Sequence, residues 1–244
     1  MPRPLLIVKV GTTLPELRER RGDYERWFEA GLGLERTPLE ICSVFQGETL
    51  PHPDQLAGVL ITGSSAFVSS REDWSERTAA WLPGAVMAGI PVLGVCYGHQ
   101  LLAHALGGEV GRNPRGREIG TIEVDLSAAQ DDPLLGGLGE HCRFNATHVE
   151  SVLRLPAGTE VLASNELDPH HAYRLTGPGR RAWGCQFHPE FDDDVIRGYL
   201  EGRRAILAEE GLDPDALLAG AEATPAGTAV LRRFGAMVEA ELDR

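Results

Sequence analysis

The chain has 244 residues, of which 42% are hydrophobic, and it carries a formal net charge of −13. This length suits one domain with a sizeable core and leaves room for no more than a small appendage. The acidity argues against nucleic acid or an anionic membrane as the main partner, although a local basic patch is compatible with an anionic substrate. No apolar run reaches the ~20 residues that a membrane-spanning helix needs.

The first residues and the cysteines bear on the compartment. The apolar run Leu5–Val10 is too short for a secretory signal and lacks a small-residue cleavage site, so it predicts a first buried strand. No two of the four cysteines have Cys-x-x-Cys spacing, and metal spacing such as His-Glu-x-x-His is absent. We therefore expect a reduced, cytoplasmic protein without a metal or cofactor, in which Cys42 and Cys185 pack in the core. The role of Cys142 stays open.

The first half of the chain alternates apolar strands with amphipathic helices. Strands are expected at 5–10, 40–45, 57–62 and 91–95, and helices at 23–30 and 73–88. Pro83 and Gly84 predict a kink or a split in the second of these helices. Buried strands separated by helices predict a mostly parallel sheet with helices on both faces, which places the active-site loops at the carboxyl ends of the strands.

The second half is richer in strands, which are expected at 120–126, 143–146, 151–155, 161–164, 171–175 and 182–187. Most of them read as antiparallel additions to the sheet, and one as its last central strand. Helices are expected at 192–209 and 224–242, and Gly/Pro-rich loops at 107–116 and 131–139. We expect residues 1–200 to form one domain and residues 201–244 to be a helical extension packed on it.

The strand at 91–95 leads directly into the most informative motif of the chain. Cys96 is flanked by Gly94 and Gly98, and an apolar helical pattern begins at once. This Gly-x-Cys-x-Gly pattern at a strand-to-helix turn is the cysteine form of a nucleophile elbow. Because the helix N-terminus favours the thiolate, Cys96 is the candidate nucleophile.

A second motif supplies a base and a group that orients it. The apolar strand at 182–187 ends at His188, and Glu190 lies two residues further on, before a helix. His188 is suited to take the thiol proton and later to protonate a leaving amine, while Glu190 fixes its tautomer and stabilises the imidazolium. A helix-capping turn with a solvated His and Glu is the alternative for this motif alone.

Three motifs resemble those of the class I (triad) glutamine amidotransferases. Residues 94–100 (Gly-Val-Cys-Tyr-Gly-His-Gln) are similar to the nucleophile motif of that family, residues 186–190 (Gln-Phe-His-Pro-Glu) to its His/Glu motif, and residues 61–65 (Ile-Thr-Gly-Ser-Ser) to its oxyanion loop. The similarity spans about residues 5 to 200. It implies a flavodoxin-like α/β sheet and hydrolysis of the glutamine side-chain amide through a γ-glutamyl thioester on Cys96, with release of ammonia.

The remaining site roles follow from position and from this resemblance. The N–H of Tyr97 begins the helix and is one oxyanion-hole candidate, and the family motif implies the N–H of Ser64 as the other. The family more often has two glycines where this chain has Gly63 and Ser64. The resemblance also implies that Gln100 contacts the glutamyl end of the substrate, and that the turn at 147–150 holds its amino-acid end.

Thr147 and His148 are therefore candidate substrate contacts, although a capped turn is an almost equal alternative. His99 is expected to line the pocket or to bond to a nearby loop. The other histidines are expected to be structural or exposed, and they are His52, His104, His141, His170 and His171.

Segment 107–120 is rich in glycine and arginine but lacks the P-loop pattern Gly-x-x-x-x-Gly-Lys-Ser/Thr. A mobile strand-loop-strand beside the active site is the better interpretation, in which Arg112, Arg115 or Arg117 meets an anionic acceptor or a partner protein. The residues after 200 predict helices only, and no ATP pyrophosphatase-like motif is present. The ammonia is therefore expected either to reach a separate synthetase subunit or to be released directly.

The chain also resembles stand-alone γ-glutamyl peptidases and proteins similar to the glutaminase part of GMP synthase. The expected substrate is therefore a small molecule, either glutamine or a γ-glutamyl compound such as a peptide. A regulatory or binding module that kept the fold is a different class of function, and a complete set of Cys96, His188 and Glu190 argues against it. A related group of cysteine hydrolases and chaperones usually has a histidine directly after the nucleophile, where this chain has Tyr97.

Overall fold

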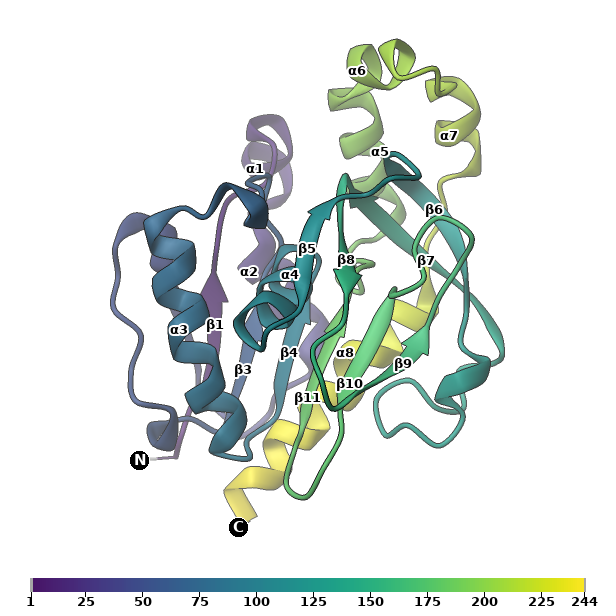
Figure 1. Cartoon of the computed structure of the whole chain (residues 1–244). Coiled ribbons are helices and arrows are strands. Elements are labelled where there is room, and N and C mark those ends of the chain that lie inside the picture. Colours follow the sequence, from purple (N-terminus) through teal and green to yellow (C-terminus); the bar gives the residue numbers. More distant parts are fainter. Residues whose placement is uncertain (1, 244) are drawn as a thin grey trace.

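A seven-stranded sheet forms the centre of the molecule in a computed structural model that describes residues 2–243 (Figure 1). Its strands lie in the order β2-β1-β3-β4-β11-β10-β9. From β2 to β11 the neighbours pair in parallel, whereas β10 and β9 are antiparallel additions. The strand bounds are β1 (Leu5–Lys9), β2 (Leu39–Ser43), β3 (Gly58–Ile61), β4 (Val92–Val95), β9 (Thr159–Ala163), β10 (Ala172–Leu175) and β11 (Ala182–Cys185).

Helices cover both faces of this sheet because side chains along each strand point alternately to opposite sides. In β1, Leu5 and Ile7 belong to one buried cluster and Leu6 and Val8 to the other. Helices α2 and α8 pack in the first cluster, and α3 and α4 in the second (Figure 1). The predicted α/β fold, mostly parallel with added antiparallel strands, is confirmed.

The helix bounds are α1 (Pro15–Arg21), α2 (Tyr24–Leu32), α3 (Asp73–Met87), α4 (Tyr97–Ala105), α5 (Asp193–Gly202), α6 (Arg204–Glu209), α7 (Pro214–Gly220) and α8 (Pro225–Glu239). Among residues 2–243, no helix has both the length and the apolar character that crossing a membrane requires.

Two small antiparallel sheets flank the end of the main sheet. One pairs β5 (Glu109–Arg112) with β8 (Glu150–Arg154), and the other pairs β6 (Glu118–Asp125) with β7 (His141–His148). Only Val149 separates β7 from β8, so the chain turns sharply between them. This turn at 147–150 lies where both small sheets meet, and it forms part of the site described below.

The structure differs from the sequence-based expectations in several places, one of which is helix α1, where no helix was expected. Helix α3 continues through Pro83, because Leu82 and Ala85 on either side of it are fully buried and hold the helix against the sheet. The helix expected at 192–209 is divided into α5 and α6 at Arg203, whose φ of −114° and ψ of 8° end the first helix after Gly202. Strand β5 lies within the segment expected to be a loop at 107–116, where β8 supplies its pairing partner.

The parallel strands β3, β4 and β11 are direct neighbours and end at the same edge of the sheet (Figure 1). Ile61 pairs with Gly94, and Val95 pairs with Cys185. The residues that follow these strands therefore meet, although they are far apart in the sequence. They are the loop at residues 62–65, the turn at Cys96 and the segment with His188 and Glu190.

Candidate active site

Cys96 occupies a sharp turn between β4 and α4. Its backbone has a φ of 52° and a ψ of −102°, an uncommon conformation for a residue with a side chain. The turn is possible because its neighbours are small: a Cβ on Gly94 would lie 2.4 Å from the carbonyl oxygen of Gly98, and a Cβ on Gly98 would lie 2.5 Å from that of Ile61. The sequence pattern of the elbow thus corresponds to a strained turn that presents the sulfur at the end of the sheet.

His188 and Glu190 form a buried pair beside this turn. His188 Nδ1 and Glu190 Oε1 are 2.7 Å apart, and the two side chains are only 1% and 0% exposed. The backbone N–H of His188 donates to the carbonyl of Asn145 on β7 at 2.8 Å. The ring of Phe191 stacks on the imidazole with centroids 3.9 Å apart, so the orientation of the ring is determined by packing as well as by Glu190.

The electrostatic environment favours a thiolate beside an imidazolium. Burial would raise the pKa of Cys96, but the nearby charge of His188 outweighs it, with a smaller effect of His148, and the pKa lies below its usual value. Burial likewise opposes the charged form of His188, yet Glu190 and Cys96 together raise its pKa to about 10. His188 Nε2 is buried and makes no hydrogen bond among the described residues, so no other group competes with Cys96 for it.

The loop after β3 approaches the elbow closely. A Cβ on Gly63 would lie 2.9 Å from Cε1 of His188, so this position has room only for glycine unless the ring moves. The hydroxyl of Thr62 accepts from the N–H of Val10 and donates to the carbonyl of Gly63, which fixes the loop. Ser64 lines the same cavity as Cys96 and Tyr97. Tyr97 is the first residue of α4, so its N–H has no acceptor within that helix.

A cavity of about 320 Å³ opens beside the sulfur. It collects six of the residues that the sequence singled out, which are Ser64, Cys96, Tyr97, Gln100, Thr147 and His148. Gly63, His188 and Glu190 are not among the residues that line it. The cavity thus lies on one side of Cys96, with the His188–Glu190 pair outside its lining.

Gln100 uses both of its amide hydrogens in hydrogen bonds within the protein, so neither is free for a ligand. Its Nε2 donates to the backbone carbonyl of Glu150 at 2.7 Å and to Oε1 of Gln186 at 2.9 Å. Thr147 lies closer to the sulfur: its carbonyl oxygen is 3.8 Å from Cys96 Sγ, and its hydroxyl accepts from Arg203 Nη1 at 2.6 Å.

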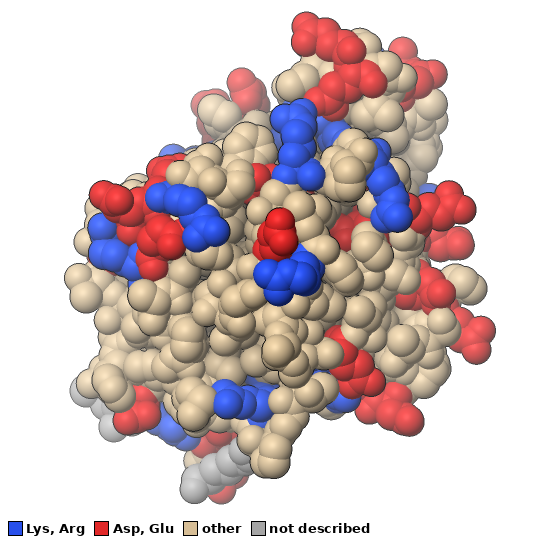
Figure 2. All heavy atoms as spheres, viewed as in Figure 1, with Lys and Arg blue, Asp and Glu red and all other residues tan. Residues whose placement is uncertain are grey.

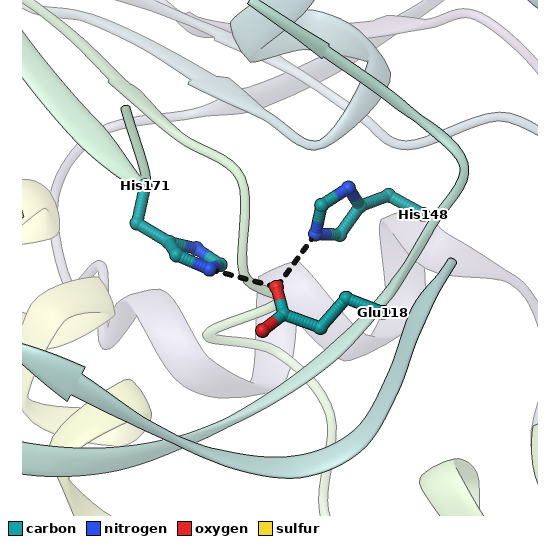
Figure 3. A group of neighbouring side chains, drawn as sticks. All are labelled: Glu118, His148 and His171. Carbon is teal, nitrogen blue, oxygen red and sulfur yellow. Dashed lines mark hydrogen bonds and ion pairs between the residues drawn. The ribbon is translucent and has the colours of Figure 1, made fainter. Parts of the chain in front are cut away.

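His148 belongs to a buried cluster that the sequence analysis missed (Figure 3). Its Nε2 lies 2.9 Å from Oε2 of Glu118, and Nε2 of His171 lies 2.8 Å from the same oxygen. Burial would raise the pKa of Glu118, but the hydrogen bonds of the two histidines lower it below its usual value. The three ligand atoms lie within 4.8 Å of one another, as in a metal site, but the shared carboxylate oxygen already gives both imidazoles a partner.

The cluster positions the turn at 147–150. His148 Nδ1 lies 3.1 Å from the carbonyl oxygen of Glu150, so the imidazole links β6 to both ends of the turn. The carboxylate of Glu150 accepts from the N–H of Ser69 at 3.3 Å and from its hydroxyl. His171 was expected to lack a partner, and only the pairing of distant segments reveals Glu118 beside it.

The remaining histidines and cysteines lie away from the sulfur or in the core. His99 is fully buried, which lowers its pKa to about 3, and its ring packs against Tyr173 with centroids 4.9 Å apart. Cys42, Cys142 and Cys185 are buried free cysteines. His52 caps a short 3-10 turn, His104 bonds to Arg71 and Glu76, and His170 bonds to the carbonyl of Val152.

The glycine- and arginine-rich segment forms β5, a loop and the start of β6. Arg117 reaches the cavity beside Cys96, but its guanidinium is engaged by Glu210, with Nε–Oε2 and Nη2–Oε1 distances of 2.7 and 3.0 Å. Figure 2 shows that acidic side chains are prominent on the tip of the molecule near α6 and α7, with basic side chains on the surface next to it.

Comparisons with known proteins agree with the family that the sequence motifs resemble. The family model "Glutamine amidotransferase class-I" matches residues 48–197. A GMP synthase from Aeropyrum pernix is 40% identical over 144 residues, which cover 59% of this chain and 25% of that protein. A GMP synthase from Parafrankia is 31% identical over 208 residues, which cover 81% of this chain and 34% of that protein.

Among solved structures, a glutamine amidotransferase from Thermotoga maritima aligns over 100% of both chains with a TM-score of 0.73 and 18% identity. At this level of identity the likeness supports the fold alone. The chain spans only about a quarter to a third of the length of these two GMP synthases.

Proposed function

The chain belongs to the class I glutamine amidotransferase family, and we propose that it is a cysteine hydrolase that cleaves the γ-glutamyl amide bond of glutamine or of a γ-glutamyl compound. The observation that carries the proposal is the strained turn at Cys96 next to the buried pair of His188 and Glu190. A thiol with a lowered pKa at such a position is suited to nucleophilic attack.

In the first step, the Cys96 thiolate attacks the γ-carbonyl carbon of the substrate. A C–S bond forms, and the carbonyl π electrons move onto oxygen. The backbone N–H groups of Ser64 and Tyr97 are the proposed donors to this oxyanion, and each such donor typically contributes about 3 kcal/mol to stabilisation of the transition state.

In the second step, the tetrahedral intermediate collapses and the C–N bond breaks. His188 transfers the proton on Nε2 to the departing nitrogen, which leaves as ammonia or as an amine, and a γ-glutamyl thioester remains on Cys96. Glu190 stabilises the imidazolium until that transfer, as its 2.7 Å contact with Nδ1 allows.

Hydrolysis then repeats the sequence with water. His188 takes a proton from the water, whose oxygen attacks the thioester carbonyl, and the same two N–H groups receive the second oxyanion. When this intermediate collapses, the C–S bond breaks and the γ-carboxylate product leaves. The sulfur leaves as the thiolate, the proton taken from water stays on His188, and the carboxylic acid product gives its own proton to solvent, which restores the resting thiolate and imidazolium.

The fate of the ammonia is a further part of the proposal. Several relatives are named glutamine-hydrolysing GMP synthases, but this chain spans only part of their length. We propose that the ammonia either reaches a separate synthetase subunit or is released directly, and that residues 1–200 are the catalytic domain. Residues 201–244 would then be an extension on the same domain, which is supported by the packing of α8 with α2 in one core cluster.

The test is a turnover assay with the purified chain. Glutamine and γ-glutamyl dipeptides are supplied separately, and release of ammonia or of free amino acid is measured. The wild type is expected to turn over at least one of them, and Cys96→Ala to turn over none while its circular dichroism spectrum stays unchanged. Cys42→Ala changes another buried cysteine in β2 and is the matched control. Full turnover by Cys96→Ala would overturn the proposal.

A further inference from the structure

One arginine of the cavity beside Cys96 has a charge that the mechanism does not use. Arg203 lies at the break between α5 and α6 and lines the cavity together with Ile206. It also lies outside residues 48–197, which the family model matches. Its position is therefore a feature of this chain that the family match does not assign.

The partners of Arg203 hold its guanidinium in place without neutralising it. Nη1 donates to the hydroxyl of Thr147 at 2.6 Å, and the guanidinium carbon lies 5.1 Å from the ring centroid of Tyr199. Within residues 2–243, Arg203 forms no direct ion pair, so its other N–H groups are not bonded to a carboxylate. The hydrogen bond of Arg117 and, to a smaller extent, the charge of Arg203 lower the pKa of the nearby Glu210.

The other charged groups that line the cavity already have partners. Arg117 is engaged by Glu210 through two hydrogen bonds. His148 pairs with Glu118, and the carboxylate of Glu150 accepts from Ser69. An anion that enters the cavity therefore finds one cation among the described lining residues, Arg203, that is not already in a direct ion pair.

The arrangement around Cys96 indicates which end of the substrate reaches Arg203. In the proposed mechanism the leaving amine must approach His188, which is not among the residues that line the cavity. The cavity is therefore left for the part that stays bound to sulfur, the glutamyl group with its α-amino and α-carboxylate groups. Thr147 lies between the sulfur and Arg203, because its carbonyl oxygen is 3.8 Å from Cys96 Sγ and its hydroxyl accepts from Arg203.

We infer that Arg203 binds the α-carboxylate of the substrate and so selects γ-glutamyl compounds in which that carboxylate is free. The inference rests on the proposed function, because it takes Cys96 as the nucleophile. A planar guanidinium with unused N–H groups is suited to binding a carboxylate through two parallel hydrogen bonds.

The test measures how fast Cys96 is labelled, which requires no turnover. The glutamine-like diazoketone 6-diazo-5-oxo-L-norleucine has an α-carboxylate, whereas iodoacetamide has none. The rate constants of both reagents at Cys96 are measured by peptide mass spectrometry for the wild type, Arg203→Met and Arg203→Lys. Arg204→Met is the matched control, because the neighbouring Arg204 instead pairs with Glu201 and Asp215.

Arg203→Met is expected to slow labelling by the diazoketone roughly 10- to 100-fold, as for the loss of hydrogen bonds to a charged group, and to leave the iodoacetamide rate within about twofold. Arg203→Lys keeps the charge without the planar fork and is expected to be intermediate. If Arg203→Met does not fold, Arg203→Lys alone decides the comparison. Arg204→Met is expected to change neither rate.

Equal slowing of both reagents would overturn the inference, because Arg203 would then act only by positioning Thr147. No slowing of either reagent would also overturn it, as would a wild type that the diazoketone does not label. Failure of the proposed function has a different signature: neither glutamine nor a γ-glutamyl dipeptide is turned over by the wild type, whatever the labelling rates.

Discussion

Replacing Glu190 by Gln removes one charge from the site with almost no change of shape. The amide oxygen is still able to accept from His188 Nδ1, so the tautomer of the imidazole is kept and the charge of the partner is lost. Glu190 Oε2 is buried without a hydrogen-bonding partner among the described residues. The NH₂ group that replaces it is therefore unsatisfied as well, and we expect the variant to lose about 1 to 3 kcal/mol of unfolding free energy.

The magnitude of the functional effect follows from the pKa of His188. Burial opposes its charged form, yet Glu190, as the larger of two causes, and Cys96 raise that pKa from 6.5 to about 10. If Glu190 contributes about 2 kcal/mol to this rise in pKa, its loss makes protonation of His188 roughly 30-fold less favourable. Because His188 in turn holds the pKa of Cys96 down, against burial, the pKa of the thiol rises in the variant.

The sign of the pH effect can be measured directly. In the wild type, the thiolate–imidazolium pair forms above the lowered pKa of Cys96 and is lost as the pH rises through about 10, where His188 gives up its proton. The iodoacetamide rate at Cys96 is measured between pH 5 and pH 9. Glu190→Gln is expected to move the rise of this rate to higher pH, so that at pH values below the rise its rate is roughly 30-fold lower than that of the wild type.

The control is Glu222→Gln, which removes an exposed carboxylate that pairs with Arg143 on the surface. It is expected to leave the pH profile unchanged. A profile of Glu190→Gln that coincides with that of the wild type would refute the reasoning, because the carboxylate would then have no influence on the cysteine.

Three more predictions concern stability, measured as the free energy of urea unfolding. Gly98→Ala is expected to cost about 1 to 3 kcal/mol, because the new Cβ would lie 2.5 Å from a backbone oxygen. The control Gly220→Ala is expected to cost little, because Gly220 has open space around it. Equal losses of stability in the two variants would contradict this prediction. Cys96→Gly is expected to be more stable than Cys96→Ala by about 1 kcal/mol, because the φ of 52° suits glycine, and the reverse order would argue against strain at the turn. Burial would raise the pKa of Glu118, but the hydrogen bonds of His148 and His171 lower it below its usual value. The stability that ionised Glu118 contributes is therefore present above pH 4.5 and is lost as the pH falls below that value. Glu118→Gln is therefore expected to cost about 1 to 3 kcal/mol at pH 7 and to lose less stability than the wild type between pH 5 and pH 3. If the unfolding free energies of variant and wild type fell in parallel over this range, the interaction of Glu118 with the two histidines would not contribute as described.

Much of the site was predictable because its candidate catalytic residues occur in short contiguous sequence motifs. The elbow around Cys96 and the segment with His188 and Glu190 each follow an apolar strand. The rule that parallel strands end at one edge of the sheet is enough to predict that they meet. The structure agrees: Val95 at the end of β4 pairs with Cys185 at the end of β11, so the residues that follow the two strands lie side by side.

The parts that were missed depend on contacts between distant segments. Glu118 and His171 lie on opposite sides of β7 in the sequence, and no local spacing marks them as partners of His148. Arg203 was hidden within a helix expected to run from 192 to 209, where an exposed helical arginine is unremarkable. Gly202 before it and the Asp213-Pro214 pair, where Asp213 caps α7, were signals of helix ends that could have been used.

The most direct test of the account is to trap the intermediate on the nucleophile. The wild-type chain is mixed with glutamine or a γ-glutamyl dipeptide, quenched with acid during turnover, digested and analysed by mass spectrometry. We predict a γ-glutamyl group on the peptide that contains Cys96, and a larger amount of it in a variant whose deacylation is slowed. Release of ammonia or amine with no such adduct, or with the adduct on Cys42, Cys142 or Cys185, would contradict the central claim.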